Sequence, residues 1–215
     1  MASIAEQLMH NRHFSQVYQH LWRPVFTRGF SLGASETVDY DRALRAYLRR
    51  PGARRILDVA CGPGNYAADA AAGLTGDGCY VGLDFSQAML AQADRSNRVE
   101  RATFVRGDAH HLPFRSGSFD TVTCLAALYL IPDPLSAIDE MVRVLAPGGE
   151  LILFTSVRAS IAALPGAAGL AGLAGLRLFG RTELTRHLQA HDLIEVEQTI
   201  TGVGQYVHAR RARPR

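Results

Sequence analysis

Apolar residues in the middle of the chain alternate between short continuous runs and stretches with helical spacing. Runs of aliphatic and β-branched residues, each the length of a buried strand, cover Arg55–Val59, Tyr80–Leu83, Thr103–Arg106, Asp120–Cys124 and Glu150–Phe154. Helical spacing follows Ser86, a suitable N-cap, and Asp133-Pro134, with Pro147-Gly148-Gly149 as the stop. This repeated order predicts right-handed crossovers and a parallel sheet with helices on both faces.

The C-terminal part follows a different pattern. Thr182 can cap a helix that runs to about Ala190, and two alternating runs then cover Leu193–Thr199 and Gly204–His208. Only Ile200–Val203 joins these runs, and so short a link requires antiparallel pairing. The predicted fold class is therefore α/β, with a doubly wound, mostly parallel seven-stranded sheet and an antiparallel C-terminal hairpin.

The expected organisation is one compact domain with two segments outside the sheet. Residues 1–50 are expected to form an N-terminal helical cap or lid, and residues 51–215 the core. The predicted helices of the cap cover residues 14–22 and 36–49. Residues 157–180 are rich in Gly, Ala and Leu and are expected to form a lid insertion. Within it, residues 159–176 are uncharged, but Pro165-Gly166 interrupts them, so no stable membrane insertion is expected.

Composition excludes several classes of protein. The chain has 215 residues, 47% hydrophobic and 20% charged, which suits one ordinary folded domain. Its net charge of +3 is too small to indicate nucleic acid binding. Cys61, Cys79 and Cys124 are widely spaced, which argues against disulfides and a thiolate metal site. The N-terminus lacks the apolar core of a signal peptide, so a cytoplasmic location is expected. The expected state is a monomer or homodimer, with no bound metal.

Acidic residues follow three successive predicted strands. Asp58, Asp84 and Asp108 occupy these positions, and a turn containing Gly62 and Gly64 follows the first strand. Ligands of parallel sheets bind at the carboxyl ends of the strands, where an acid after the second strand can accept hydrogen bonds from a ribose diol. These residues predict a nucleoside-containing ligand. They leave NAD open, because the glycine turn also matches G-x-G-x-x-A.

Five segments narrow the choice of ligand. In chain order they are Leu57–Gly64, Gly82–Ser86, Gly107–Phe114, Ser118–Asp120 and Arg143–Gly149. Together they resemble class I S-adenosylmethionine (SAM)-dependent methyltransferases of the type 11 domain, particularly the small-molecule group that includes ubiquinone and menaquinone methyltransferases. An NAD-dependent oxidoreductase would account only for the first two segments. The resemblance implies a Rossmann-like fold, SAM as the cofactor and S-adenosylhomocysteine as its product.

The resemblance also implies roles for individual residues. Gly62 and Gly64 would lie against the methionine part of SAM, with Asp58 near its ammonium group, and Asp84 would hold the ribose hydroxyls. Asp108 and Ala109 would meet the adenine. The implied cofactor-binding residues are Asp58, Ala60, Cys61, Gly62, Gly64, Asp84, Phe85, Met89, Asp108, Ala109, His110 and Leu125.

The chain departs from the family pattern at two positions. Ala60 stands where the first glycine is usual, and Tyr129 stands where relatives often have His, which weakens the transfer of a general base. The signature of the quinone group after the fourth strand is not evident, and the Asn/Asp-Pro-Pro-aromatic motif of amino-directed nucleic acid methylation is missing. No catalytic residue is assigned.

The acceptor is expected to be a small apolar or aromatic molecule, methylated at oxygen, carbon or nitrogen. Candidates for lining its pocket are Tyr18, His20, Trp22 and Tyr129. Two alternatives stay open: an NAD-dependent oxidoreductase, and a protein of this fold that uses bound SAM for chemistry other than methyl transfer.

Overall fold

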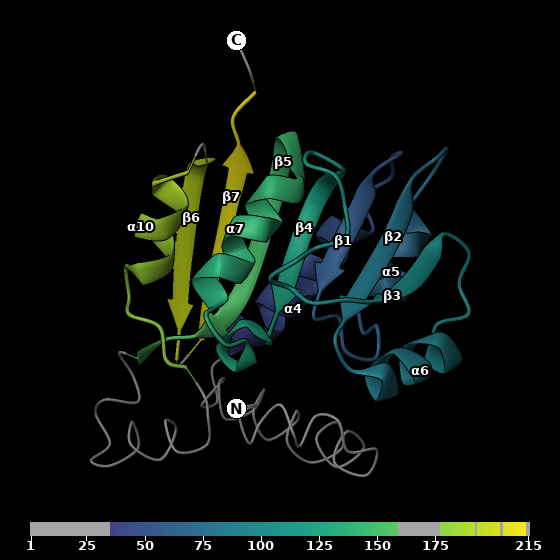
Figure 1. The fold of residues 1–215 in the computed structure, drawn as a ribbon, viewed down its shortest axis with the longest axis horizontal. Coiled ribbons are helices and arrows are strands. Elements are labelled where there is room, and N and C mark those ends of the chain that lie inside the picture. The colour runs from purple at the N-terminus through teal and green to yellow at the C-terminus, as the bar shows by residue number, and fades with distance from the viewer. Residues whose placement is uncertain (1–34, 159–176, 192, 203, 214–215) are drawn as a thin grey trace.

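The computed structural model describes residues 35–158, 177–191, 193–202 and 204–213, with side-chain burial from residue 39 onward. Its strands form one seven-stranded sheet in the order β3-β2-β1-β4-β5-β7-β6 (Figure 1). Their bounds are β1 Arg55–Val59, β2 Cys79–Asp84, β3 Ala102–Arg106, β4 Phe119–Leu125, β5 Leu145–Ser156, β6 Leu193–Thr201 and β7 Gly204–Arg211. Strands β1 to β5 pair in parallel, whereas β7 is antiparallel to both β5 and β6. The predicted parallel sheet and C-terminal hairpin are confirmed.

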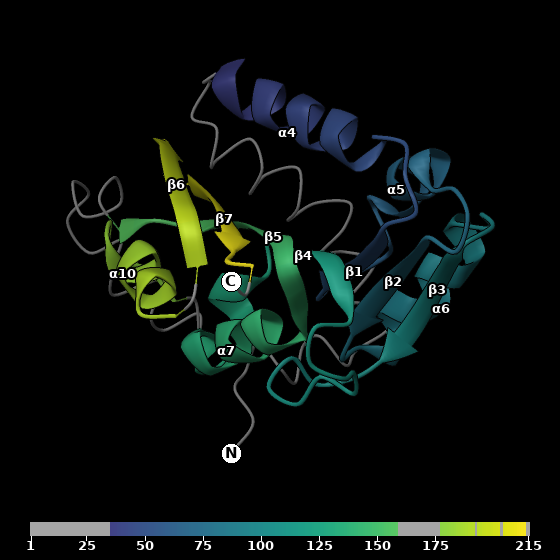
Figure 2. The ribbon, with the colours of Figure 1, turned by 90° about the horizontal axis from the view of Figure 1, so that it is seen from above.

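Helices cover both faces of this sheet, as predicted. They are α4 Ser35–Leu48, α5 Ala67–Gly73, α6 Gln87–Ser96, α7 Pro134–Val144 and α10 Glu183–Gln189, with a 3-10 turn η2 at Leu128–Leu130. Figure 2 shows α4 and α5 on one face and α7 and α10 on the opposite face. Ser86 caps α6 as expected, since its Oγ accepts a hydrogen bond from the Met89 N–H at 3.4 Å.

Burial explains why the central strands are so apolar. Ile56, Leu57 and Val59 of β1 are fully buried, because β1 lies inside the sheet with helices on both sides. On α7, Ala137, Ile138 and Met141 are fully buried and form the face that packs on the sheet.

The start of β5 was predicted wrongly. Helix α7 ends at Val144, and β5 begins at Leu145 rather than Glu150, so Pro147-Gly148-Gly149 lies within the strand. The pairing of β4 with β5 shifts register at this point, and Gly148 has φ +79°. Proline and glycine are common at such bulges, so the same residues that stop a helix also suit an irregular strand start.

The cap on α10 was only half right. Thr182 occupies the N-cap position but makes no capping hydrogen bond. Its Oγ1 instead accepts from the Arg186 guanidinium at 2.7 Å, while the Glu183 carboxylate accepts the Gly180 N–H at 2.8 Å. Glu183 thus ties the segment before α10 to the first residue of the helix, and no described side chain caps its N-terminus.

Several predicted features lie outside the described residues. These are the helix over residues 14–22 and most of the lid insertion, so the division into cap, core and lid stays a prediction. In the part of the chain that the structure describes, no helix combines the length and apolar character needed to cross a membrane.

Candidate functional site

The carboxyl ends of the parallel strands meet at one edge of the sheet. Strand β1 lies between β2 and β4, and the chain order reverses between β1 and β4. Loops that follow β1, β2 and β3 therefore gather at this switch point, where ligands of doubly wound sheets bind. The predicted glycine turn and the strand-end acids all belong to this region.

Asp84 anchors the glycine turn. Its Oδ2 accepts the Gly62 N–H at 2.9 Å and its Oδ1 accepts the Ser86 N–H at 2.8 Å. Burial raises the pKa of Asp84, although these backbone hydrogen bonds favour the ionised carboxylate. The Asp84 carboxylate at the end of β2 thus holds the glycine turn that follows β1, and the two N–H donors fix its orientation.

The two glycines of the turn have different surroundings. Both have left-handed backbones, with φ +57° at Gly62 and +73° at Gly64. A Cβ at Gly62 would meet nothing within 4 Å, whereas a Cβ at Gly64 would lie 2.7 Å from Asn97 Nδ2 and 2.8 Å from the Phe104 ring. Gly64 therefore serves packing, and Gly62 presents open space beside Asp84. This bare backbone next to a fixed carboxylate fits the ribose and methionine parts of SAM.

Ala60 has the same left-handed backbone, with φ +57°. Alanine pays about 1–2 kcal/mol in this conformation and glycine does not, although glycine loses more chain entropy on folding. We expect Ala60→Gly to raise the free energy of unfolding by about 0.5–1 kcal/mol. Chemical denaturation checks this, with Ala68→Gly on the exposed side of α5 as a control that should lower stability. A less stable Ala60→Gly variant would contradict the strain at Ala60.

Asp58 is turned into the sheet. It is 2% exposed, and its carboxylate accepts hydrogen bonds from the Tyr80 hydroxyl on β2 and the Thr123 hydroxyl on β4, both at 2.7 Å. Burial, together with Asp58, raises the pKa of Tyr80 well above its ordinary value. Asp58 therefore joins three strands, and its predicted place beside the ammonium group of SAM stays a prediction. Cys61 is also buried, which raises the pKa of its thiol.

His110 links the loop after β3 to the loop after η2. Its Nδ1 lies 2.8 Å from Asp108 Oδ1 and its Nε2 lies 2.5 Å from the Pro132 carbonyl oxygen. Burial opposes charge on this ring, but these two acceptors outweigh it and raise the pKa of His110. Asp108 Oδ1 also accepts the His110 N–H at 2.9 Å. These hydrogen bonds hold Asp108 and Ala109, the residues predicted to contact the adenine, and the Ala109 side chain is partly exposed.

The other residues predicted to bind the cofactor or the acceptor differ in how exposed they are. Phe85, next to Asp84, is 51% exposed, whereas Met89 is buried. Of these two side chains, only that of Phe85 is available at the surface to contact a ligand. Leu125 ends β4 and is partly exposed. Tyr129 is buried in the main core cluster. Tyr18, His20 and Trp22 lie outside the described residues.

Two features of this region were missed by sequence reasoning. Ala126, directly after β4, has φ +57°, and its N–H donates to the Phe154 carbonyl at 2.8 Å. Asn97, at the end of α6, donates from Nδ2 to the Pro63 carbonyl at 2.9 Å and so supports the glycine turn. No pattern marks Ala126. A polar residue at a helix C-terminus signals a cap but not this second, distant bond.

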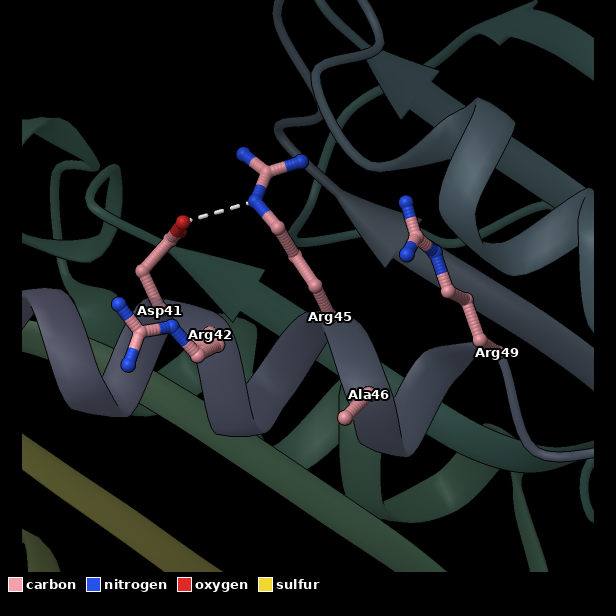
Figure 3. Close-up of a pocket in the computed structure, with 5 residues that line it drawn as sticks. All are labelled: Asp41, Arg42, Arg45, Ala46 and Arg49. Carbon is pink, nitrogen blue, oxygen red and sulfur yellow. Dashed lines mark hydrogen bonds and ion pairs between the residues drawn. The ribbon is translucent and has the colours of Figure 1, made fainter.

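A separate depression lies along α4 (Figure 3). It is lined by Asp41, Arg42, Arg45, Ala46 and Arg49. Arg49 pairs with Asp69 of α5 at 2.5 Å, and Arg45 contacts the same carboxylate. These ion pairs fasten α4 to the helix that follows the glycine turn. None of the predicted cofactor residues lines this depression.

A seven-stranded sheet in this order, with β7 antiparallel, is the Rossmann-like methyltransferase fold. Residues 57–153 match the family model described as a methyltransferase domain. The chain is 39% identical over 172 residues to the demethylmenaquinone methyltransferase of Lactiplantibacillus plantarum, across 73% of this chain and 72% of that protein. The chain therefore belongs to the family of SAM-dependent methyltransferases. The oxidoreductase alternative is thereby set aside.

Other relatives agree to different extents. The demethylmenaquinone methyltransferase of Staphylococcus aureus is 35% identical over 130 residues, across 59% of this chain but only 53%, about half, of that protein's length. A SAM-dependent methyltransferase from Mesorhizobium loti superposes with a TM-score of 0.64 at 22% identity, over 79% of this chain and 96% of that chain. A chain in a complex of the Haloferax volcanii Trm112 methyltransferase activator with a putative methyltransferase superposes at 0.71, with 15% identity, over 99% and 100%. These two structures show the fold alone.

Proposed function

We propose that this chain transfers the methyl group of SAM to a ring carbon of a small apolar aromatic acceptor of the demethylmenaquinone type. The observation that carries the proposal is the 39% identity to a demethylmenaquinone methyltransferase, which extends over 172 residues and so beyond the family core. Further relatives of 35% and 43% identity have the same name. The absence of the quinone signature after β4 makes the acceptor the point to test.

We propose that the cofactor lies along the edge described above. The Asp84 carboxylate, already fixed by the Gly62 and Ser86 N–H groups, accepts the ribose hydroxyls on its outer lone pairs. Gly62 leaves room for the methionine part. The exposed Phe85 ring would lie against the adenine, and the Asp108 carboxylate would accept a hydrogen bond from the adenine amino group. Bound SAM supplies an electrophilic methyl group on a positively charged sulfur.

The chain's own contribution is alignment of the two reactants. In-line transfer needs the nucleophilic carbon, methyl and sulfur on one axis in a dry site, and such orientation supplies much of the rate. His110 is engaged at both ring nitrogens and Tyr129 is buried in the core, so neither is placed to remove a proton. Among the described residues this favours an acceptor that is already ionised, such as the anion of a hydroquinone. The sulfur–methyl bond breaks as the new carbon–carbon bond forms, and the ring proton is lost to water when the ring becomes aromatic again.

A panel of acceptors tests the proposal. Protein, SAM and a short-chain demethylmenaquinol kept reduced under anaerobic conditions should release S-adenosylhomocysteine and give a product heavier by one methylene. Simple phenols, catechols and amines of similar size form the rest of the panel, and reactions without acceptor give the background. Turnover of another class, with none of the quinol, would contradict the acceptor while leaving the donor unaffected.

A further inference from the structure

Three potential metal ligands lie together away from the cofactor edge. Asp139 comes from α7, His187 from α10, and His191 from the turn just after α10. Asp139 Oδ1 lies 2.7 Å from His187 Nε2 and 2.9 Å from His191 Nε2. The ligand atoms of all three side chains lie within 4.8 Å of one another. Two imidazoles thus direct the same ring nitrogen at one carboxylate oxygen.

This donor set suits a divalent transition metal. Imidazole nitrogen and carboxylate oxygen are common zinc ligands at about 2.0–2.2 Å, and a tetrahedral ion places its ligand atoms roughly 3–3.5 Å apart. The separations of Asp139 Oδ1 from the two histidine nitrogens, 2.7 and 2.9 Å, need only small shifts of the side chains to reach that geometry. The side chains are 48%, 21% and 34% exposed for Asp139, His187 and His191, so solvent can supply a fourth ligand.

The backbone that carries these ligands is firmly held. On α7, Ala137 and Ile138, which directly precede Asp139, are fully buried, and on α10 Leu184 and Leu188 are fully buried. Figures 1 and 2 show α7 and α10 side by side on one face of the sheet. His187 in the last turn of α10 and His191 in the turn that follows both direct Nε2 at Asp139 Oδ1. Ligands fixed in this way lose little conformational freedom on binding an ion.

We propose that Asp139, His187 and His191 bind one zinc-class divalent ion, which clamps α7 to α10. The ion takes the place between the two Nε2 atoms and Oδ1, and both imidazoles bind it in the neutral form. Because β6 follows α10 directly, the clamp stabilises the sheet edge formed by β6 and β7 against separation from the core. The site is independent of the proposed methyl transfer.

Titration of the untagged full chain with Zn²⁺ by calorimetry tests this, with Co²⁺ absorption as a readout of coordination geometry. We expect one equivalent bound, a visible Co²⁺ spectrum typical of low coordination number, and a rise in melting temperature with added metal. His187→Ala, His191→Ala and Asp139→Asn should each lower the affinity at least about tenfold. All measurements use a Cys79→Ser background, because Cys79 is the partly exposed cysteine among the described residues.

His208→Ala is the matched control. His208 lies on β7, partly exposed and outside the cluster, so its loss should leave metal affinity unchanged. Circular dichroism establishes that each variant is folded. None of the three ligand positions is fully buried, and if one variant fails to fold, the other two decide the result. Absence of Zn²⁺ binding, or equal affinity in the ligand variants and in His208→Ala, would overturn the proposal.

Discussion

Replacing Asp84 by asparagine is expected to weaken binding of SAM about 100-fold while the chain stays folded. The carboxylate is the proposed acceptor for two ribose hydroxyls, and hydrogen bonds to a charged group are worth about 1.5–3 kcal/mol each. Asparagine keeps the shape and one acceptor oxygen but loses the charge. Its amide must also face one of the two N–H donors, from Gly62 or Ser86, that Asp84 now accepts, so a fall of about 1–2 kcal/mol in unfolding free energy is expected as well.

Calorimetry with SAM and S-adenosylhomocysteine measures this effect. Asp94→Asn on the exposed side of α6 is the matched control and should bind both ligands as the unaltered chain does. Burial raises the pKa of Asp84, so the affinity of the unaltered chain should fall as the pH drops through that raised pKa. The Asp84→Asn variant should lack this dependence. A folded Asp84→Asn protein with undiminished affinity would refute the ribose assignment.

The sheet could be predicted well because strands buried on both faces are continuous runs of apolar residues. β1 is buried on both faces and was predicted from Arg55 to Val59, the bounds that it has. The hairpin of β6 and β7 followed from the length of its link alone. Pro147-Gly148-Gly149 misled because proline and glycine end helices and also form strand bulges, and only the pairing with β4 distinguishes the two.

The site was harder to predict, because its details depend on contacts between distant segments. The sequence indicates that Asp58 ends a strand but not that the hydroxyls of Tyr80 and Thr123 hold its carboxylate inside the sheet. Nor does it show that His110 reaches the Pro132 carbonyl. The grouping of Asp139 with two histidines of α10 and the turn after it has the same origin, since α7 and α10 meet only in the folded chain.

Alanine substitutions at Gly62 and Gly64 are expected to act on different properties, SAM affinity at Gly62 and folding stability at Gly64. Both positions have positive φ, so each substitution costs about 1–2 kcal/mol of backbone strain. At Gly64 the new methyl group would also overlap the Phe104 ring and Asn97, and overpacking adds about 1–3 kcal/mol. Gly64→Ala should therefore destabilise the chain by about 3 kcal/mol or more, a large part of the stability of an ordinary domain.

Gly62→Ala adds its methyl group to open space and should cost stability only through backbone strain. Its main effect should be on binding, because the methyl group occupies the surface proposed for the methionine part of SAM, and we expect affinity to fall about tenfold or more. Denaturant titration and calorimetry on both variants separate the two effects. Full SAM affinity in Gly62→Ala would place the cofactor elsewhere, whereas an undiminished unfolding free energy in Gly64→Ala would show that Phe104 and Asn97 can move aside. The pair therefore distinguishes the glycine that the fold requires from the glycine that the ligand requires.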